Sequence, residues 1–230
     1  MKDIFILQIE TATPVCSVAV SRSGKTIAVV EADEFNIHAS QLTVFVEQVL
    51  TKAEVSMSQL DAIAVSMGPG SYTGLRIGVS TAKGLCYGLD LPLLAINTLD
   101  SMVHGFSMLQ SAKAGYSLMP MIDARRMEVY TAQYNMVGLA KIQDTRASII
   151  DPDFFAHTVD KFILFGNGAD KFADMFAASR NVTITTSFLN SATHMSQLAY
   201  AKFCSKRFED LIYFEPFYLK DFIATTPKQR

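Results

Sequence analysis

Hydrophobic and polar positions follow two different periods in the opening part of the chain. Residues 4–9 are a short apolar run, and alternation resumes at 15–20 and at 26–31, which predicts three strands joined by turns. From 38 to 53 the apolar positions recur every three or four residues, which predicts an amphipathic helix. The pattern therefore indicates an antiparallel meander followed by a helix.

Strands and helices then alternate. Residues 61–66 and 92–96 are short apolar runs typical of buried strands. A long helix is predicted from 74 to 89, and another helix begins at Thr98. The pattern weakens into small and polar residues at 105–115, and we place the boundary between two halves there.

The C-terminal half, residues 106–230, repeats the order of the N-terminal half, residues 1–105. An apolar strand at 118–122 leads through a turn into an alternating strand at 128–134. Three further elements are expected: a strand at 161–165 that enters a glycine turn, and helices at 170–178 and 194–207. This repeat predicts a duplicated α/β fold, in which each half has a mixed sheet flanked by helices, with a cleft between the halves.

An acidic residue follows the first strand of each half: Glu10 in one and Asp123 in the other. Equivalent strand ends would point both carboxylates into the cleft, where they could hold a metal–nucleotide. Alternatively, each carboxylate accepts hydrogen bonds from N–H groups of the turn or helix after it. The spacing leaves both roles open.

A glycine-rich segment follows the strand at 61–66 and opens the long helix. In that position, backbone N–H groups and the helix N-terminus can cradle a phosphate. The segment is not a Walker loop, because it lacks the Gly-Lys-Ser/Thr ending, and a plain tight turn is the alternative. The candidate phosphate-loop residues are Gly68, Gly70, Ser71, Thr73 and Gly74.

The helix at 74–89 carries small or apolar residues over an arc of roughly 220°, against about 100° for an ordinary surface helix. Its interior residues Gly78 and Gly84 each cost about 1 kcal/mol relative to Ala. Close approach of another backbone would offset that cost. One side of the helix can pack on the chain's own sheet, and the other needs a second helix from this chain or from a partner. An internal core helix is the alternative.

Composition narrows the class of protein. Of the 230 residues, 50% are hydrophobic and 18% are charged, which excludes a disordered chain. No apolar run approaches the ~20 residues of a membrane span, and no signal peptide is evident. A formal net charge of -2 argues against an autonomous nucleic-acid binder. Three cysteines without metal-type spacing indicate reduced thiols, so we expect a cytoplasmic protein with no membrane contact.

Familiar catalytic and metal-binding motifs are missing from the sequence. The four histidines never occur at the i, i+4 spacing of a helical zinc pair, and no Gly-x-Ser-x-Gly elbow is present. We therefore assign no catalytic residue and no metal ligand.

Four segments resemble the TsaB (YeaZ) family: residues 60–85 around the glycine-rich segment, 9–12, 122–130 and 217–220. The family usually has Asp where this chain has Glu10. The resemblance implies an actin-like, hexokinase-like ATPase (ASKHA) fold. It also implies a role in making threonylcarbamoyladenosine at position 37 of tRNAs that read codons beginning with A. Within that pathway, the family supplies the non-catalytic partner of TsaD, and TsaE, an ATPase, completes the bacterial complex.

TsaD itself carries a metal-binding His-x-x-x-His motif. The corresponding positions here are about Thr98 and Met102, and neither side chain replaces an imidazole as a metal ligand. The resemblance therefore implies the scaffold of TsaD without its metal site.

The resemblance further implies that the helices at 38–53 and 74–89 bind TsaD or a second copy of the chain. The residues expected in that interface are Leu42, Phe45, Val49, Leu75, Gly78, Ala82 and Leu85. We therefore expect a scaffold subunit that reaches tRNA only within the complex. It would bind no cofactor firmly, although ATP or ADP could enter the complex. The alternatives are an independent nucleotide-dependent enzyme using Glu10 and Asp123, and a homodimer without an enzyme partner.

Overall fold

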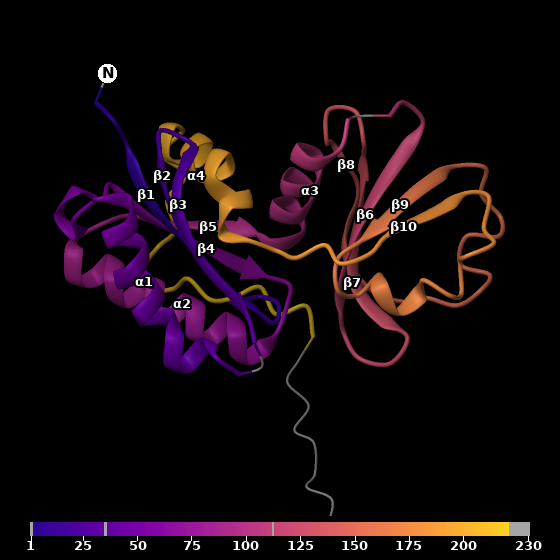
Figure 1. Ribbon diagram of the computed structural model, residues 1–230, viewed down its shortest axis with the longest axis horizontal. Helices are drawn as coiled ribbons and strands as arrows, with labels where there is room; N and C mark the ends of the chain where they lie inside the picture. The colour runs from indigo at the N-terminus through magenta and orange to yellow at the C-terminus, as the bar shows by residue number, and fades with distance from the viewer. Residues whose placement is uncertain (1, 35, 112, 221–230) are drawn as a thin grey trace, which may run out of the picture.

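The computed structural model describes residues 2–34, 36–111 and 113–220, which form two five-stranded sheets side by side (Figure 1). In the first sheet the strand order is β3-β2-β1-β4-β5. Strands β1, β2 and β3 pair antiparallel, as the meander predicts, whereas β4 and β5 run parallel to β1. The strands are β1 (Phe5–Glu10), β2 (Val15–Arg22), β3 (Lys25–Asp33), β4 (Ala62–Gly68) and β5 (Leu93–Asn97).

The second sheet has the order β10-β9-β6-β7-β8. Read from β8, the sequence of antiparallel and parallel pairings is the same as in the first sheet, so the predicted duplication is confirmed. The pattern did not predict β8 or β10, because β8 is a largely exposed, charged edge strand and β10 has only four residues. The strands are β6 (Tyr116–Asp123), β7 (Glu128–Asn135), β8 (Lys141–Ile149), β9 (Lys161–Phe165) and β10 (Val182–Thr185).

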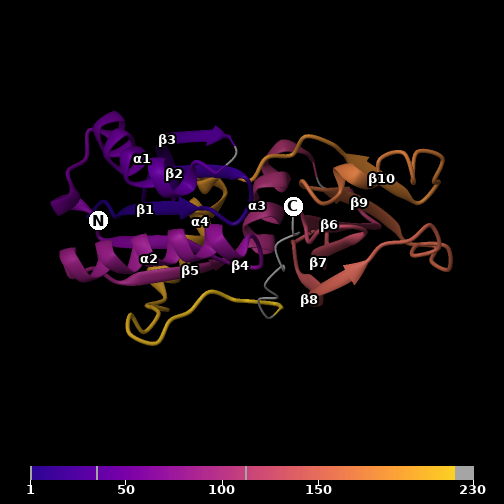
Figure 2. The ribbon, with the colours of Figure 1, turned by 90° about the horizontal axis from the view of Figure 1, so that it is seen from below.

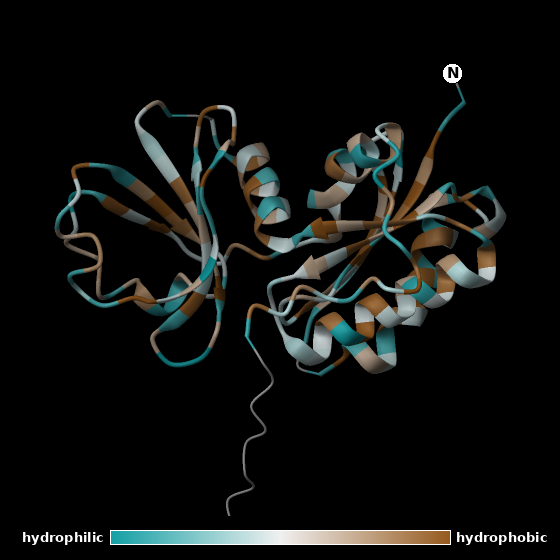
Figure 3. Ribbon diagram, turned by 180° about the vertical axis from the view of Figure 1, so that it is seen from behind, coloured by the Kyte–Doolittle hydropathy of each residue, from teal (hydrophilic) through white to brown (hydrophobic). Residues whose placement is uncertain are grey.

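Helices cover both faces of the first sheet. Successive side chains of a strand point to opposite faces, so Leu7 and Ile9 pack under α1 (His38–Ala53) and α2 (Tyr72–Leu89). Ile6 instead packs with Ala199 of α4 (Ser196–Cys204) on the other face. Figure 1 shows α1 and α2 below the sheet and α4 above it, and Figure 3 shows hydrophobic residues concentrated in the central strands. Among the helices that the structure describes, none has the length and apolarity needed to cross a bilayer.

Helix α3 (Thr98–Leu109) connects the two halves and lies between the sheets (Figures 1 and 2). The side chain of Asn97 caps its first turn by accepting hydrogen bonds from the N–H groups of Leu99 and Asp100. Asp100 also joins α3 to the second sheet, because it accepts a hydrogen bond from the Tyr134 hydroxyl at 2.6 Å. The interior of the second half is rich in phenylalanine, including the stacked pair Phe106 and Phe165.

The described residues also include three short 3-10 helices: η1 (Met57–Gln59), η2 (Asp170–Phe172) and η3 (Ala192–Met195). The prediction of a helix at 170–178 is wrong. Phe172 and Phe176 produce helical spacing, but the segment is mostly closed by i, i+3 turns while both rings enter the core.

The last described segment returns to the first sheet. After α4, the Glu209 N–H donates to the Leu93 carbonyl at 2.9 Å, and the Phe217 N–H donates to the Met67 carbonyl at 2.7 Å. The sequence places these residues in the half 106–230, whereas their contacts are with the N-terminal sheet. A single boundary between residues 105 and 106 does not account for a C-terminal segment that folds back onto the first sheet.

Candidate functional site

The residues expected in a helical interface lie largely in the chain's own core. Leu42, Phe45 and Val49 of α1 are buried against the first sheet, as are Leu75, Gly78 and Ala82 of α2, and Leu85 is half-buried. The residues that α1 and α2 can offer to a partner are therefore the exposed ones that alternate with these buried positions. We call this set the helix surface; it comprises Val44, Glu47, Thr51, Arg76, Ser80, Gly84, Tyr87 and Gly88.

The glycines of α2 divide into two groups. A Cβ atom on Gly74 or Gly78 would collide with Thr11 in the turn between β1 and β2. Gly84 and Gly88 are exposed, and a Cβ atom on either would meet nothing within 4 Å. The sequence predicts close approach of another backbone at Gly78, but Gly78 instead packs on the side chain of Thr11, and it is Gly74 that meets the Thr11 backbone. The last turns of α2 remain open to a second molecule.

The glycine-rich segment uses its own N–H groups for the fold. The Ser71 N–H donates to the Ala12 carbonyl at 2.7 Å, and the Gly74 N–H donates to the Ser71 side chain at 3.3 Å. Gly70 packs so tightly on Ala12 that no side chain fits there, and Gly68 adopts φ +112. Thr73 is exposed at the start of α2. These residues form a capped turn on the first sheet that engages the N–H groups of Ser71 and Gly74, and phosphate binding by the segment stays a prediction.

Glu10 is completely buried in the first half. One carboxylate oxygen accepts hydrogen bonds from the Ala12 N–H at 2.7 Å and the Ser66 hydroxyl at 2.8 Å, and the other accepts from the Asn190 side-chain amide at 2.8 Å. Burial raises the pKa of this carboxyl group to about 7, although the hydrogen bonds oppose the rise. Glu10 therefore links β1, β4 and the returning segment.

Asp123 has a different environment. It is exposed and forms an ion pair with Lys171 at 2.5 Å, and it accepts a hydrogen bond from the Arg125 N–H at 3.2 Å. Neither Asp123 nor Glu10 is among the residues that line the cavity between the halves. The structure thus gives both carboxylates the alternative role that the sequence left open, as acceptors for the turns after their strands.

The positions that correspond to the TsaD metal motif are also buried. Thr98 and Met102 lie in α3 and are at most 1% exposed. In the described part of the chain, no group of three His, Cys, Asp or Glu residues could hold a metal ion.

Sequence reasoning missed a polar cluster around the returning segment. Ser191 donates a hydrogen bond to Glu31 at 2.7 Å, and the ring of His194 contacts Asn190 at 3.3 Å. Burial lowers the pKa of His194 to about 4. Asn190 and Ser191 lie more than 150 residues along the sequence from the residues they contact in β1 and β3. Only a prediction that the chain returns to the first sheet could have found these contacts.

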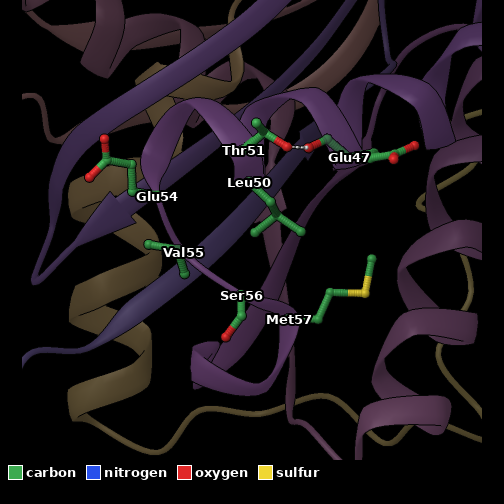
Figure 4. Close-up of a pocket in the computed structure, with 7 residues that line it drawn as sticks. All are labelled: Glu47, Leu50, Thr51, Glu54, Val55, Ser56 and Met57. Carbon is green, nitrogen blue, oxygen red and sulfur yellow. Dashed lines mark hydrogen bonds between the residues drawn. The ribbon is translucent and has the colours of Figure 1, made fainter.

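A pocket of about 350 Å³ lies at the C-terminal end of α1 (Figure 4). Glu47 and Thr51 belong both to its wall and to the helix surface, so the pocket is continuous with that surface. Its lining is mainly apolar. The residues are Glu47, Leu50, Thr51, Glu54, Val55, Ser56 and Met57.

Three comparisons relate the chain to known proteins. A family model described as "TsaD: tRNA N6-adenosine threonylcarbamoyltransferase" matches residues 35–226. The "tRNA threonylcarbamoyladenosine biosynthesis protein TsaB" of Escherichia coli is 30% identical over 95% of this chain and 96% of that protein. The structure of YeaZ from Pseudomonas aeruginosa has a TM-score of 0.76 and 27% identity, and the match covers 95% of this chain and all of that one.

A more distant structure supports the fold alone. Component A of the Acidaminococcus fermentans (R)-2-hydroxyglutaryl-CoA dehydratase matches with a TM-score of 0.53 at 10% identity, over 86% of this chain and 98% of that one. With the duplicated sheets, these matches confirm the expected actin-like ATPase (ASKHA) fold. Both the coverage and the identity of the curated relative show that the chain belongs to the TsaB (YeaZ) family.

Proposed function

We propose that this chain is a non-catalytic subunit in tRNA threonylcarbamoyladenosine biosynthesis. It binds TsaD and thereby allows threonylcarbamoylation of adenosine 37 in tRNAs that read codons beginning with A. The name of the Escherichia coli relative supports the pathway, and the family model named for the transferase supports kinship with TsaD. TsaE joins the complex. This chain contacts tRNA, ATP or ADP only within the assembled complex.

The observation that carries the proposal is the open end of α2. Gly84 and Gly88 lie one turn apart on the exposed side of the helix, with nothing within 4 Å of either Cβ position. Tyr87 beside them is 85% exposed. Small residues allow two helix backbones to approach closely, and an exposed tyrosine supplies a large contact at low entropic cost. The helix surface therefore suits a helix of a partner protein.

Three features support a non-catalytic role. The Glu10 carboxylate is occupied by three donors inside the protein. The N–H groups of Ser71 and Gly74 are bonded within the chain rather than free for phosphate. Thr98 and Met102 stand where the resemblance places the TsaD histidines. The same features make an independent nucleotide-dependent enzyme the weaker candidate.

The decisive experiment uses Gly84→Leu, because a leucine there has open space in the isolated chain. We expect an unchanged or higher melting temperature, at least a tenfold loss of affinity for the TsaD of the same organism, and loss of modified adenosine from tRNA in cells. Tenfold corresponds to about 1.4 kcal/mol. The matched control is Ala201→Leu, an exposed site on α4 across the sheet. Normal TsaD binding by Gly84→Leu would contradict the assignment of the helix surface.

The same surface gives a second prediction about assembly. Without TsaD, two copies of the chain pair through the helix surface, since the same open glycines can face one another. Sedimentation at rising concentration should show a dimer for the wild type and a monomer for Gly84→Leu. A dimer that survives this substitution would place self-association elsewhere.

A further inference from the structure

Asn190 connects two titratable side chains inside the protein. It lies in the segment 186–191, which returns from β10 to η3 (Figure 1), and it is 3% exposed. Its side-chain amide nitrogen donates a hydrogen bond to Oε2 of Glu10 at 2.8 Å. Its amide oxygen lies 3.3 Å from Nδ1 of His194. The amide group therefore presents a donor to one titratable side chain and an acceptor to the other.

The Nδ1 atom of His194 faces two partners that make opposite demands. The Asn190 amide oxygen can only accept, so its contact requires a proton on Nδ1. The Ser191 N–H can only donate, at 3.3 Å to the same nitrogen, so its contact requires an unprotonated Nδ1. A neutral imidazole satisfies one of these partners at a time, and the choice sets its tautomer.

The protonation state of Glu10 decides how the Asn190 amide is oriented. Oε1 of Glu10 accepts hydrogen bonds from the Ala12 N–H and the Ser66 hydroxyl, whereas Oε2 accepts one from Asn190. Oε2 is therefore the oxygen that takes up a proton. Ionised, Oε2 needs the amide nitrogen of Asn190; protonated, it donates and needs the amide oxygen instead. A half-turn of the amide group meets this need and brings its nitrogen to face His194.

Two other titratable side chains lie around Glu10. Cys16 of β2 interacts with Glu10 electrostatically, but burial raises the pKa of its thiol to about 11. His38 of α1 contacts the Thr13 carbonyl at 3.1 Å. Burial raises the pKa of Glu10 itself to about 7. Glu10 therefore changes its charge near neutral pH, where Cys16 does not.

His194 lies where η3 meets the helix that connects the halves. Glu31 of β3 and His104 of α3 both interact with it electrostatically, and burial lowers the pKa of both histidines, that of His194 to about 4. The two rings are therefore neutral at pH 7. Gly105 of α3 packs directly on the His194 ring, since a Cβ atom on Gly105 would lie 2.3 Å from Cγ. A change at His194 thus acts at the junction of the two halves.

We propose that Asn190 is a two-position switch that couples protonation of Glu10 to the tautomer of His194 and thereby to the start of η3. With Glu10 ionised, His194 carries its proton on Nδ1, and the Ser191 N–H loses its acceptor. With Glu10 protonated, His194 carries its proton on Nε2, and Nδ1 accepts from the Ser191 N–H and the Asn190 amide. Solvent supplies the proton that Glu10 takes up. The imidazole stays neutral, because it gains a proton at Nε2 when it loses one at Nδ1.

Nitrogen NMR of the full chain, labelled with ¹⁵N-histidine, tests the proposal because the two tautomers give different ring-nitrogen shifts. Between about pH 5.5 and 8.5, we expect His194 to change from the Nε2–H to the Nδ1–H form with a midpoint at about 7. Glu10→Gln and Asn190→Leu should each hold His194 in one tautomer throughout. Glu47→Gln, which removes an exposed acid on α1, should keep the wild-type midpoint. Melting temperatures verify that each variant is folded.

Hydrogen exchange at the Ser191 amide gives a second readout. After correction for the intrinsic exchange rate, its protection should fall roughly twofold to tenfold as the pH rises through neutrality, the size expected for one hydrogen bond. Glu10→Gln should abolish this fall, and Glu47→Gln should not.

A single His194 tautomer across the whole pH range in the wild type would overturn the proposal, even where Asn190→Leu does not fold. A change of tautomer that persists in Glu10→Gln would overturn it as well, because another group would then drive the change. If Glu47→Gln shifts the midpoint as much as Glu10→Gln abolishes it, the effect is one of general charge and the switch is wrong. None of these readouts requires TsaD, so they are independent of the proposed scaffold role.

Discussion

Gly78 of α2 lies directly on Thr11, so that a Cβ atom on Gly78 would overlap the Thr11 hydroxyl oxygen. Gly74, one turn earlier, lies equally close to the Thr11 carbonyl oxygen. The two glycines bring α2 onto the turn between β1 and β2 and hold that turn beside the buried Glu10. Their conformational cost is offset by contacts within the chain.

We predict that Gly78→Ala destabilises the protein by roughly 1–3 kcal/mol, the usual range for overpacking a filled site. Gly84→Ala should instead be neutral or stabilising by up to about 1 kcal/mol, because its Cβ has open space and alanine favours helix. Urea unfolding measures both. Adding Thr11→Ala should recover part of the Gly78→Ala loss, since it removes the hydroxyl oxygen that the new methyl group meets. If the two substitutions change the free energy of unfolding additively, the proposed contact between residues 78 and 11 is wrong.

The sequence predicts local elements well where one period dominates. The helix at 38–53 matches α1 at both ends, because its apolar stripe is continuous and faces one sheet. The sequence predicts close packing at Gly78 and assigns it to a second backbone, whereas the group that packs there is the side chain of Thr11. Thr11 lies far away in sequence, and spacing alone does not distinguish a turn of the same chain from a partner's helix.

The candidate site was less predictable for a related reason. The Asn190 side-chain amide donates a hydrogen bond to Glu10, which lies 180 residues away in the sequence, and no local sequence pattern predicts this pair. The sequence did anticipate an acid at the end of each first strand. Whether such an acid faces a cleft or the interior depends on the returning segment, whose polar residues carry no periodic signal.

Gly166, after β9, should be intolerant of any side chain. Its φ is +99, and a Cβ atom would lie 2.5 Å from the Met121 carbonyl oxygen. We expect Gly166→Ala to cost more than Gly138→Ala, which has a similar φ of +78 but open space. Gly138→Ala measures only the cost of placing alanine at a positive φ, roughly 1 kcal/mol. The additional destabilisation by Gly166→Ala measures the collision of its Cβ atom with the Met121 carbonyl oxygen. Equal melting temperatures for the two variants would contradict it.

Glu10 should give the protein an unusual pH dependence. Its pKa is raised from 4.5 to about 7, so the folded state holds this proton more tightly than the unfolded chain. Its contribution is therefore fully present below about pH 4.5 and is lost as the pH rises to about 7. At 1.36 kcal/mol per unit, the change is roughly 3 kcal/mol.

The wild type alone will not display this dependence. His194 has a pKa lowered from 6.5 to about 4, so its contribution to stability is lost as the pH falls through that range, with the opposite sign. The measurement is therefore the difference between wild type and Glu10→Gln in free energy of unfolding, taken from pH 4.5 to 8. We expect this difference to decline with rising pH and to level off above about 7. A flat difference would mean that Glu10 titrates normally.

Tyr87 should separate stability from partner binding. Its side chain is 85% exposed on the helix surface, next to Gly88, so Tyr87→Ala removes almost nothing from the core. Tyrosines at the centre of an interface often contribute more than 1 kcal/mol. We therefore expect an unchanged melting temperature and at least tenfold weaker TsaD binding, measured by calorimetry. Val159→Ala, at a site that is 97% exposed in the second half, is the control and should leave binding unchanged. If Tyr87→Ala and Val159→Ala bind TsaD equally well, the partner docks on another face.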